Sequence, residues 1–499
     1  MGNLVILPIL IPVIVAVLSL VVRNNSIAVR AMGITGSAVL LAISVFILVT
    51  VSNYGTLVYQ AGNWRAPYGI TLVADLFSAI MLTFSGIIAF TISIFSSATI
   101  EKKAYKFNFF LLFHTLLMGV NGAFLTGDLF NLYVWYEVML LSSFVLITLG
   151  GDKKQLDGAI KYVTINLVSS LLFLAALGLL YGKAGTLNMA DLALKLRENP
   201  DARMFNSSAM VFFVAFGIKS AIFPFFFWLP ASYHTPPVAV TALFAGLLTK
   251  VGVYSLIRFN TLFFVHDIEF WKTLMLIIAG LTMVIGVITA ASQYDIRRIL
   301  SFHIISQIGY MVLGLGFFTP LGIAGAIYYM GHNIFAKTNT FLAGAMVARL
   351  KGSFYLKSIG GLYQKHPWIA LLFIIPAFTL AGVPPFSGFV GKFILIKAGF
   401  SAGYYFITFV ALLVGLITLF SMVKIWNEAF WKNQPNKPVK EEASTGKVTF
   451  GIWFPSLILG IINVLMGVLA APVFRLCMRA GEQLMDPTYY IRTVLNIPM

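Results

Sequence analysis

The sequence of 499 residues is poor in cysteine, in charge and in acidic side chains, and each shortage excludes a class of protein. Its single cysteine, Cys477, rules out an internal disulfide and any metal or iron–sulfur site built from several cysteines. Only 10% of the residues are charged, whereas soluble domains have about 25%. With 59% hydrophobic residues, the chain lacks the polar side chains that a soluble exterior needs, which indicates a membrane protein.

Several sequence motifs of enzymes and nucleic-acid-binding proteins are missing as well. We find no Walker A sequence, no dinucleotide fingerprint in a strand–helix setting and no HExxH motif. His303 and His332 have no companions at metal-binding spacing, so we expect no bound metal and no cofactor. The 34 Lys and Arg outnumber the 17 Asp and Glu, but they lie in short segments between apolar runs and form no basic stripe. This placement favours contact with lipid headgroups over binding of nucleic acid.

About fourteen apolar runs follow one another along the chain, each long enough to cross a bilayer as a helix. They cover residues 4–22, 31–51, 72–97, 108–126, 130–149, 158–181, 207–229, 238–258, 273–292, 298–317, 321–348, 369–398, 404–426 and 450–474. The sequence therefore predicts an all-α, polytopic membrane protein. Residues 191–199 are expected to form a short interfacial helix, and residues 432–449, rich in Pro, Lys and Glu, a flexible linker.

The basic residues between the apolar runs alternate between a richer and a poorer side of the membrane. The richer side takes Lys153 and Lys154 among others, and the poorer side takes Arg65, Lys183 and Arg258 among others. Because cytoplasmic loops carry the excess of Lys and Arg, the richer side is predicted to be cytoplasmic. Both termini then face outward, which requires an even number of spans.

The chain carries an internal repeat. The segment GAIKYVTIN begins at Gly158, and the matching segment GAIYYMGHN begins at Gly325. An odd number of predicted spans separates the two segments, so they enter the membrane in opposite directions, as in the inverted repeats of ion transporters. We expect four parts: three N-terminal spans in residues 1–107, a first repeat in 108–260, a second in 261–430, and the linker, last span and tail in 431–499.

Proline-rich breaks with nearby lysines interrupt an apolar run in each repeat. The stretch from Phe205 to Phe259 carries Lys219 and Lys250 in its two apolar halves, and the second repeat carries Lys392. The prolines that mark the breaks are Pro224, Pro230, Pro236, Pro237, Pro384 and Pro385. Irregular backbone at membrane depth is tolerated only where protein covers it or where it lines a wet cavity. A lysine near the centre of a span costs at least about 2.5–3.5 kcal/mol on insertion scales, so these residues indicate an ion site.

Further ionisable side chains lie inside the predicted spans. Glu137 lies well inside its run, and its ionised form needs a partner, for which Lys219 is the obvious candidate. The candidate relay residues are Glu137, Lys219, Lys250, His332, Lys337 and Lys392. Weaker candidates are His303, which lies roughly where the repeat places the counterpart of Glu137, His234 and Asp75. The structural alternative is a set of static ion pairs and hydrogen bonds that only hold helices together.

The runs FFFWLPASYHTPPVAVTALFAGLLTKVGVY and AGVPPFSGFVGKF, with Glu137 in its own run, resemble the proton-translocating antiporter-type membrane subunit family. This family includes the antiporter-like subunits of respiratory complex I and the two large subunits of Mrp cation/proton antiporters. The resemblance covers about residues 70–430, and its motifs are specific in combination. It implies about fourteen transmembrane helices, with two inverted five-helix repeats and broken seventh and twelfth helices.

The resemblance also implies roles for individual residues. Glu137 and Lys219 are expected to form an ion pair, Lys250 to continue the path, and Lys392 to be the terminal relay lysine. His332 and Lys337 fall on the hydrophilic axis of the family. The run VTALFAGLLTKVGVYSLIRF looks most like the Mrp subunits of type D.

The function implied is proton movement through a buried Lys/Glu/His relay that drives Na⁺ export, in a bacterial inner membrane. The expected partners are the large A subunit and the small membrane subunits of an Mrp complex, the lipid bilayer and H⁺, with Na⁺ as a further candidate. One alternative is an antiporter-like proton-pumping subunit of the N or M type of complex I, although M-type subunits typically carry Glu where this chain has Lys392. Another is a structural assembly subunit whose buried charges are static.

Overall fold

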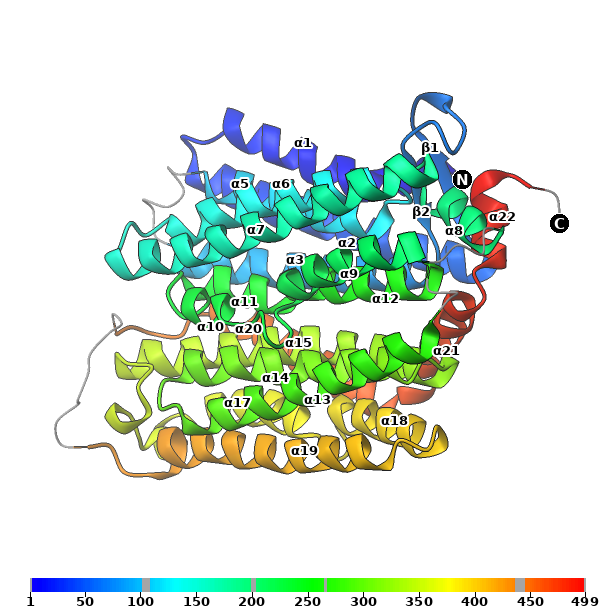
Figure 1. Ribbon diagram of the computed structural model, residues 1–499. Coiled ribbons are helices and arrows are strands. Elements are labelled where there is room, and N and C mark those ends of the chain that lie inside the picture. Colours follow the sequence, from blue (N-terminus) through cyan, green and yellow to red (C-terminus); the bar gives the residue numbers. More distant parts are fainter. Residues whose placement is uncertain (1, 101–107, 199–202, 264–266, 436–444, 498–499) are drawn as a thin grey trace.

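The computed structural model describes residues 2–100, 108–198, 203–263, 267–435 and 445–497. These residues form a bundle of helices that run roughly side by side along one direction (Figure 1). A small hairpin and several short helices cover the end of the bundle at which both ends of the chain are marked. The predicted linker lies mostly in residues 436–444, outside the described residues.

The N-terminal part joins two long helices, a β-hairpin and a third helix. A short 3₁₀-helix η1 (Gly2–Ile6) leads into α1 (Leu7–Val21), and α2 (Ser26–Tyr54) follows. Strands β1 (Leu57–Gln60) and β2 (Thr71–Ala74), with η2 (Ala61–Asn63) between them, pair antiparallel before α3 (Leu76–Thr99). The predicted span 72–97 is therefore wrong at its start, because residues 71–74 pair as a strand and helix α3 begins only after Asp75.

Both predicted repeats are made of helices. The first consists of α5 (Phe109–Leu125), α6 (Leu129–Thr148), α7 (Lys153–Ala184), α9 (Arg203–Ser220), α10 (Trp228–Ser232), α11 (Val238–Gly246) and α12 (Leu248–Phe263). The second consists of α13 (Ile268–Ser292), α14 (Ile296–Gly316), α15 (Pro320–Lys351), α17 (Pro367–Ala381), α18 (Ser387–Ser401) and α19 (Tyr405–Trp426).

Short connecting elements and a C-terminal series complete the chain. The connecting elements are α8 (Met189–Glu198), η3 (Leu356–Ser358), α16 (Leu362–Lys365) and the π-helical turn η4 (Asn427–Trp431). The C-terminal helices are α20 (Phe450–Val468), α21 (Ala470–Met485) and α22 (Thr488–Leu495). Helix α8 confirms the short helix predicted at 191–199. The polar, two-faced helices α21 and α22 were not predicted, because they are too short and too charged to be recognised as spans.

Apart from the strand at the start of 72–97, the predicted apolar runs fall on helices, and both predicted breaks are confirmed. The first separates α9 from α10 around Pro224, and the second separates α17 from α18 at Pro384 and Pro385. A third, unpredicted break at Leu247 divides α11 from α12, inside the run 238–258. Ten helical segments among the described residues are long and apolar enough to cross a membrane, so the number of fourteen spans stays a prediction.

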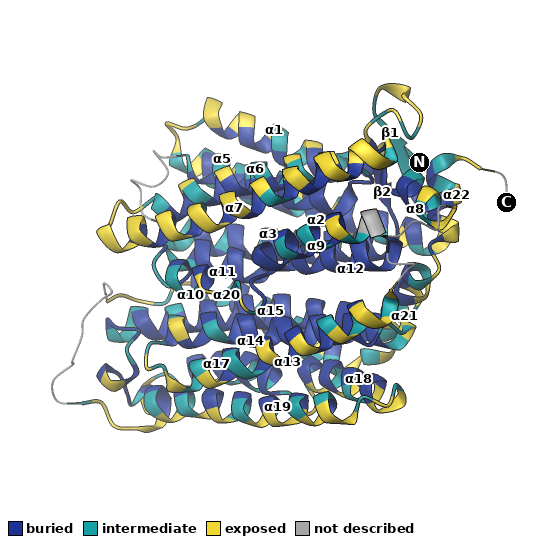
Figure 2. Ribbon diagram, viewed as in Figure 1, coloured by how far each residue is buried: buried dark blue, intermediate teal, exposed yellow. Residues whose placement is uncertain are grey.

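The inner helices of the bundle are the most buried, and the outer helices are the most exposed (Figure 2). The segment formed by α11 and α12 is buried throughout, and α14 is almost completely buried. The outer helices α1, α2, α7 and α19 expose much of their apolar surface. Lipid tails can cover such an exposed apolar face without cost, which explains why these helices are hydrophobic on the outside. The inner helices α12, α14 and α15 nevertheless carry many buried polar side chains.

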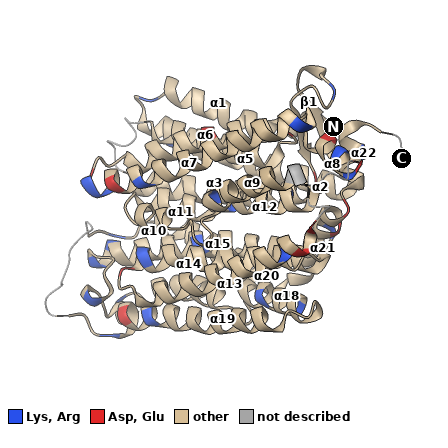
Figure 3. Ribbon diagram, viewed as in Figure 1, with Lys and Arg blue, Asp and Glu red and all other residues tan. Residues whose placement is uncertain are grey.

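Charged side chains gather at the ends of the bundle (Figure 3). The end that holds the starts of α7 and α14 is rich in Lys and Arg, and it lies opposite the end at which both chain ends are marked. This arrangement agrees with the two-sided distribution of basic residues seen in the sequence. Arg258, which the sequence analysis assigned to the poorer side at the end of the run 238–258, is buried within α12.

Helix α20 packs against the second break so closely that one glycine has no room for a side chain. A Cβ added at Gly467 would lie 2.0 Å from the Pro385 carbonyl oxygen and 2.6 Å from the Phe386 carbonyl carbon. We expect Gly467→Ala to destabilise the protein by about 1–3 kcal/mol, because backbone atoms cannot move aside as a flexible side chain can. Thermal unfolding in detergent measures the change. Gly178→Ala in α7 is the matched control, since nothing lies within 4 Å of its added Cβ; equal stability of the two variants would contradict the packing.

Candidate functional site

Lys219 lies in the last turn of α9, directly before the first break. Its ammonium donates to the Asn166 carbonyl oxygen and the Ser170 hydroxyl of α7, both at 3.3 Å, and lies 5.3 Å from the centre of the Tyr136 ring. Lys219 is 7% exposed. The buried charge is therefore held by neutral oxygens and an aromatic face.

Glu137 does not pair directly with Lys219, which corrects the expected ion pair. Among the described residues no ion pair includes either side chain, and Oε1 of Glu137 is buried without a hydrogen-bond partner. The carboxylate still acts electrostatically on Lys219 and on the neighbouring Tyr162. Glu137 and Lys219 thus interact through space, and Tyr136, which precedes Glu137 in α6, contacts the lysine.

The lysine–tyrosine contact recurs in the second repeat. Lys392, in α18 after the second break, lies 5.4 Å from the centre of the Tyr310 ring, and Tyr310 belongs to α14 as Tyr136 belongs to α6. The equivalence supports the inverted repeat. It also corrects the match of His303 with Glu137, because the residue that follows Tyr310 is Met311, and the second repeat has no carboxylate there.

Lys250 and Lys392 are both held by carbonyl groups that a helix break leaves free. The Lys250 ammonium donates to the Ala245 carbonyl oxygen at 2.6 Å, next to the break between α11 and α12. The Lys392 ammonium donates to the carbonyl oxygens of Leu380 at 3.1 Å and Ala381 at 2.8 Å, at the end of α17. The last carbonyls of a helix have no partner within it and carry its negative dipole end, so they suit a cation. The break at Leu247 was not predicted, because no proline marks it and Gly246 before it is the one local signal.

Lys337 and two histidines lie between these lysines. Lys337 of α15 is fully buried and donates to the Leu300 carbonyl oxygen of α14 at 3.4 Å. His332, one turn and a residue earlier in α15, contacts the Ser387 hydroxyl through Nδ1 at 3.1 Å. The charges of Lys392, Lys337 and Lys250 all act electrostatically on its ring, and those of Lys337 and Lys392 act on His303. The structure therefore brings five of the predicted residues into one buried group.

Buried polar atoms without a hydrogen-bond partner gather on the same helices, within the part of the chain that the structure describes. They include both ring nitrogens of His303, Nε2 of His332, the whole side-chain amide of Asn333, Nε2 of Gln307, Nδ2 of Asn339 and the hydroxyl of Thr249. These residues belong to α12, α14 and α15. Buried groups of this kind normally require water or another polar partner. The central polar region is therefore suited to transient partners.

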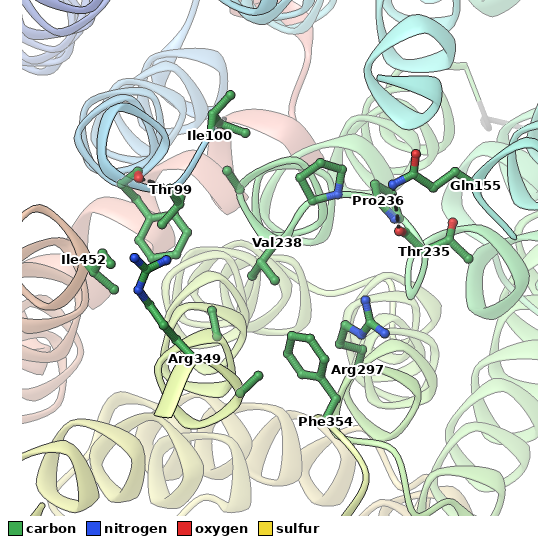
Figure 4. A pocket seen from close by; sticks show the side chains of 15 residues that line it. Thr99, Ile100, Gln155, Thr235, Pro236, Val238, Arg297, Arg349, Phe354 and Ile452 are labelled. Atoms are coloured by element: carbon green, nitrogen blue, oxygen red, sulfur yellow. Dashed lines mark hydrogen bonds between the residues drawn. The ribbon is translucent and has the colours of Figure 1, made fainter. Parts of the chain in front are cut away.

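The first proline-rich break lines two cavities at the basic end. One, of about 290 Å³, is surrounded by Arg297, Arg349 and Phe354 from one side and by Gln155, Thr235 and Pro236 from the other (Figure 4). The second, of about 760 Å³, is lined by Lys154, Lys161, Pro230, His234 and Arg298 among others. His234 lies in this second cavity, with Nδ1 within 2.7 Å of the Pro230 carbonyl oxygen, and stands apart from the buried lysines.

Asp75 is also separate from the lysine group. It is the N-cap of α3, and its carboxylate receives both terminal nitrogens of Arg258, at 2.5 and 2.8 Å. Sequence reasoning missed Arg258 as a buried residue. The spacing of Lys250, Tyr254 and Arg258, four residues apart on one helical face, was the available signal.

The buried amines can be distinguished from surface amines by chemical labelling. In the folded protein Lys250 and Lys392 are expected to react far more slowly with an amine-specific reagent than Lys161, whose side chain is 53% exposed. After denaturation the three residues should react alike. Peptide mass spectrometry measures each extent of labelling, and rapid labelling of Lys250 in the folded protein would contradict its burial.

Comparison with known proteins gives consistent matches. The family described as NADH:quinone oxidoreductase/Mrp antiporter, TM, matches residues 126–418. The D-type subunit of the Na⁺/H⁺ antiporter of Alkalihalophilus pseudofirmus is 48% identical over 99% of this chain and 100% of that protein. The D-type subunit of the Na⁺/H⁺ antiporter of Bacillus subtilis is 40% identical over 99% of this chain and 100% of that protein.

Solved structures agree. A chain of the Mrp complex from Dietzia sp. is 30% identical and superposes with a TM-score of 0.92, covering 99% of this chain and 100% of that one. A chain of respiratory complex I from Thermus thermophilus, 22% identical with a TM-score of 0.84, covers 98% of this chain and 99% of that one and shows the same fold. On these matches, the chain belongs to the NADH:quinone oxidoreductase/Mrp antiporter transmembrane family and, by its full-length identity, to the antiporter subunits of type D within it.

Proposed function

We propose that this chain is the proton-carrying, D-type subunit of an Mrp-type Na⁺/H⁺ antiporter in a bacterial membrane. The relatives matched over their full length are named as antiporter subunits, which are components of a transporter and not enzymes. The match to a chain of an Mrp complex supports assembly with the other Mrp subunits, including the large A subunit and the small membrane subunits. Inward proton flow through the complex would drive Na⁺ export.

The observation that carries the proposal is the way in which the buried lysines are held. Lys250, Lys337 and Lys392 donate to backbone carbonyl oxygens, and among the described residues none of them has a carboxylate partner. A carboxylate would fix the charge of a lysine, whereas neutral oxygens leave the amine free to gain and lose a proton. Lysine, unlike arginine, changes its protonation state readily when buried. A set of such amines is suited to relaying protons.

The proposed route runs from Lys219 through Lys250 and the His332/Lys337 region to Lys392. Glu137 modulates the first step electrostatically, because its charge acts on Lys219 without locking it in an ion pair. His303 extends the central part of the route, and the unpartnered polar atoms around it offer positions for water to carry protons between amines. Transfer between these groups needs no metal and no cofactor.

The cavities at the basic end are proposed as the cytoplasmic mouth of the route, with His234 in the larger one. The smaller cavity reaches Pro237, which caps α11, and this helix leads to the break beside Lys250. The proposed orientation places the basic end in the cytoplasm and both chain ends outside. The divisions at residues 107, 260 and 430 remain proposals about how the two repeats share this route.

A structural assembly subunit is the competing function. Static charges that only hold helices together would be expected as closed ion pairs, because an unpaired buried charge is costly. The lysines of the route do not have this form among the described residues. A subunit of complex I is less well supported, since the likeness to complex I lies at 22% identity.

Replacing the first lysine separates a relay from a scaffold. Lys219→Ala and Glu137→Ala are expected to reduce Na⁺-dependent dissipation of a proton gradient in membrane vesicles by about 10²-fold, the usual contribution of a positioned proton-transfer group. Lys219→Arg keeps the positive charge but holds its proton, so it too should abolish transport. Co-purification of the other subunits measures assembly. Normal transport with Lys219→Arg in an assembled complex would favour the scaffold.

The contact between α9 and α12 should matter for the step from Lys219 to Lys250. A Cβ at Gly252 would lie 2.6 Å from the Ser220 backbone nitrogen and 2.9 Å from the Lys219 carbonyl carbon. Gly252→Ala is therefore expected to push the two helices apart and to lower transport about ten-fold or more, as small displacements of reacting groups do. Gly217→Ala is the matched control, because its added Cβ comes closest to the flexible end of Ile222, at 3.0 Å. Equal transport rates in vesicles would contradict a transfer across this contact.

A further inference from the structure

The pair of Asp75 and Arg258 differs from the other ion pairs of the described residues. The others join side chains three or four residues apart in the chain, and each has an exposed member. Asp75 and Arg258 come from the start of α3 and from α12, and they are 6% and 7% exposed. A buried ion pair of this kind is weak support for stability, because the cost of removing two charges from water offsets their attraction. Stability alone therefore does not explain why the chain has this buried ion pair.

The pair lies at the outer end of the bundle, on the helix that carries Lys250. Arg258 follows Lys250 by two helical turns, about 12 Å, and Tyr254 lies between them on the same face. One Arg258 nitrogen that binds Asp75 also donates to the Tyr254 hydroxyl at 3.0 Å. Tyr254 in turn donates to the Phe124 carbonyl oxygen at 2.7 Å. A chain of hydrogen bonds thus joins Asp75, Arg258 and Tyr254 to the Phe124 carbonyl oxygen, and Lys250 lies one helical turn beyond Tyr254 along α12.

The C-terminal helices cover the pair from the outside. The Tyr490 ring of α22 lies 5.4 Å from the Arg258 guanidinium, and the rings of Phe77 and Tyr254 lie at 5.7 and 5.5 Å. A cavity of about 20 Å³ reaches both Asp75 and Arg258 and is lined on its outer side by Gln483, Tyr489 and Tyr490. This space can hold about one water molecule beside the carboxylate. The charged and titratable groups that face Asp75 are Arg258, Tyr254 and Tyr490, with Asp128 beyond Tyr490.

We propose that Asp75 is the outer proton acceptor of the route and that its ion pair with Arg258 is the outer gate; this inference rests on the proposed proton relay. In the closed state the carboxylate is ionised and held by Arg258. A proton delivered by water at the outer side forms an O–H bond on Asp75, which removes the anion from both Arg258 hydrogen bonds. Arg258 keeps its own proton and is released. The Asp75 O–H bond then breaks, the restored carboxylate pairs with Arg258 again, and the proton forms an N–H bond on the neutral amine of Lys250 further along α12.

The gate is tested with the whole antiporter complex in membrane vesicles, by initial rates of Na⁺-dependent dissipation of the proton gradient per assembled complex. Asp75→Asn keeps the shape of a protonated acid but cannot take up a proton. It is expected to lower the rate about ten-fold or more, in the range of a lost proton-transfer group. The Asp75→Glu variant, which restores a carboxylate, should show a clearly higher transport rate than Asp75→Asn.

The double variant Asp75→Asn/Arg258→Gln separates the gate from a structural link. If the pair only joins α3 to α12, the single variant suffers from the unpaired charge of Arg258, and removing that charge should restore both assembly and transport. If Asp75 accepts protons, the double variant assembles and stays inactive. Restored transport in the double variant, or an unchanged rate in Asp75→Asn, overturns the proposal.

Failure of the relay itself gives a different pattern. Lys250→Met in the same vesicles should be inactive if the relay exists. Transport by an assembled Lys250→Met complex would overturn the relay, whatever Asp75 does. Inactive Lys250→Met together with an active double variant would overturn only the gate.

Discussion

The central constraint on this protein is that every backbone polar group at membrane depth needs a partner. Breaking a helix there frees carbonyl groups, and the chain uses these carbonyls to hold cations. The ends of α11 and α17 each present carbonyl oxygens to a lysine of the next helix, Lys250 and Lys392 respectively. The same feature therefore allows an irregular helix inside the bundle and gives a buried amine a place to reside.

The two repeats share this plan but do not copy each other. Lys219 lies just before a proline break and Lys392 lies after one. Each contacts a tyrosine of the second helix of its repeat. Only the first repeat places a carboxylate, Glu137, beside its tyrosine. Lys250 has a break of its own, at Leu247. A path through such a protein has two distinguishable ends, which a directional transporter requires.

Neutral surroundings and ionic surroundings divide the buried charges into two kinds. The lysines contact carbonyls, hydroxyls and aromatic faces, which stabilise a cation without fixing it. Arg258 is bound on both terminal nitrogens by Asp75, in the bidentate geometry that arginine favours. The first kind suits exchange of protons, and the second suits a closed contact that one added proton would weaken. Both kinds lie along α12, eight residues apart.

The sequence by itself determined the membrane class, the position of nearly every helix, the two proline breaks and the buried lysines, because apolar length, proline and charge act locally. Tertiary structure decided the rest. The break at Leu247 has no proline and only the neighbouring Gly246 as a local marker, and the hairpin of β1 and β2 depends on pairing between residues 11 to 17 positions apart. Glu137 and Lys219 share no ion pair because the neighbouring helix α7 supplies nearer oxygens. The sequence assigned Arg258 only to one side of the membrane, and the packing of α3 and α22 around α12 encloses it with Asp75.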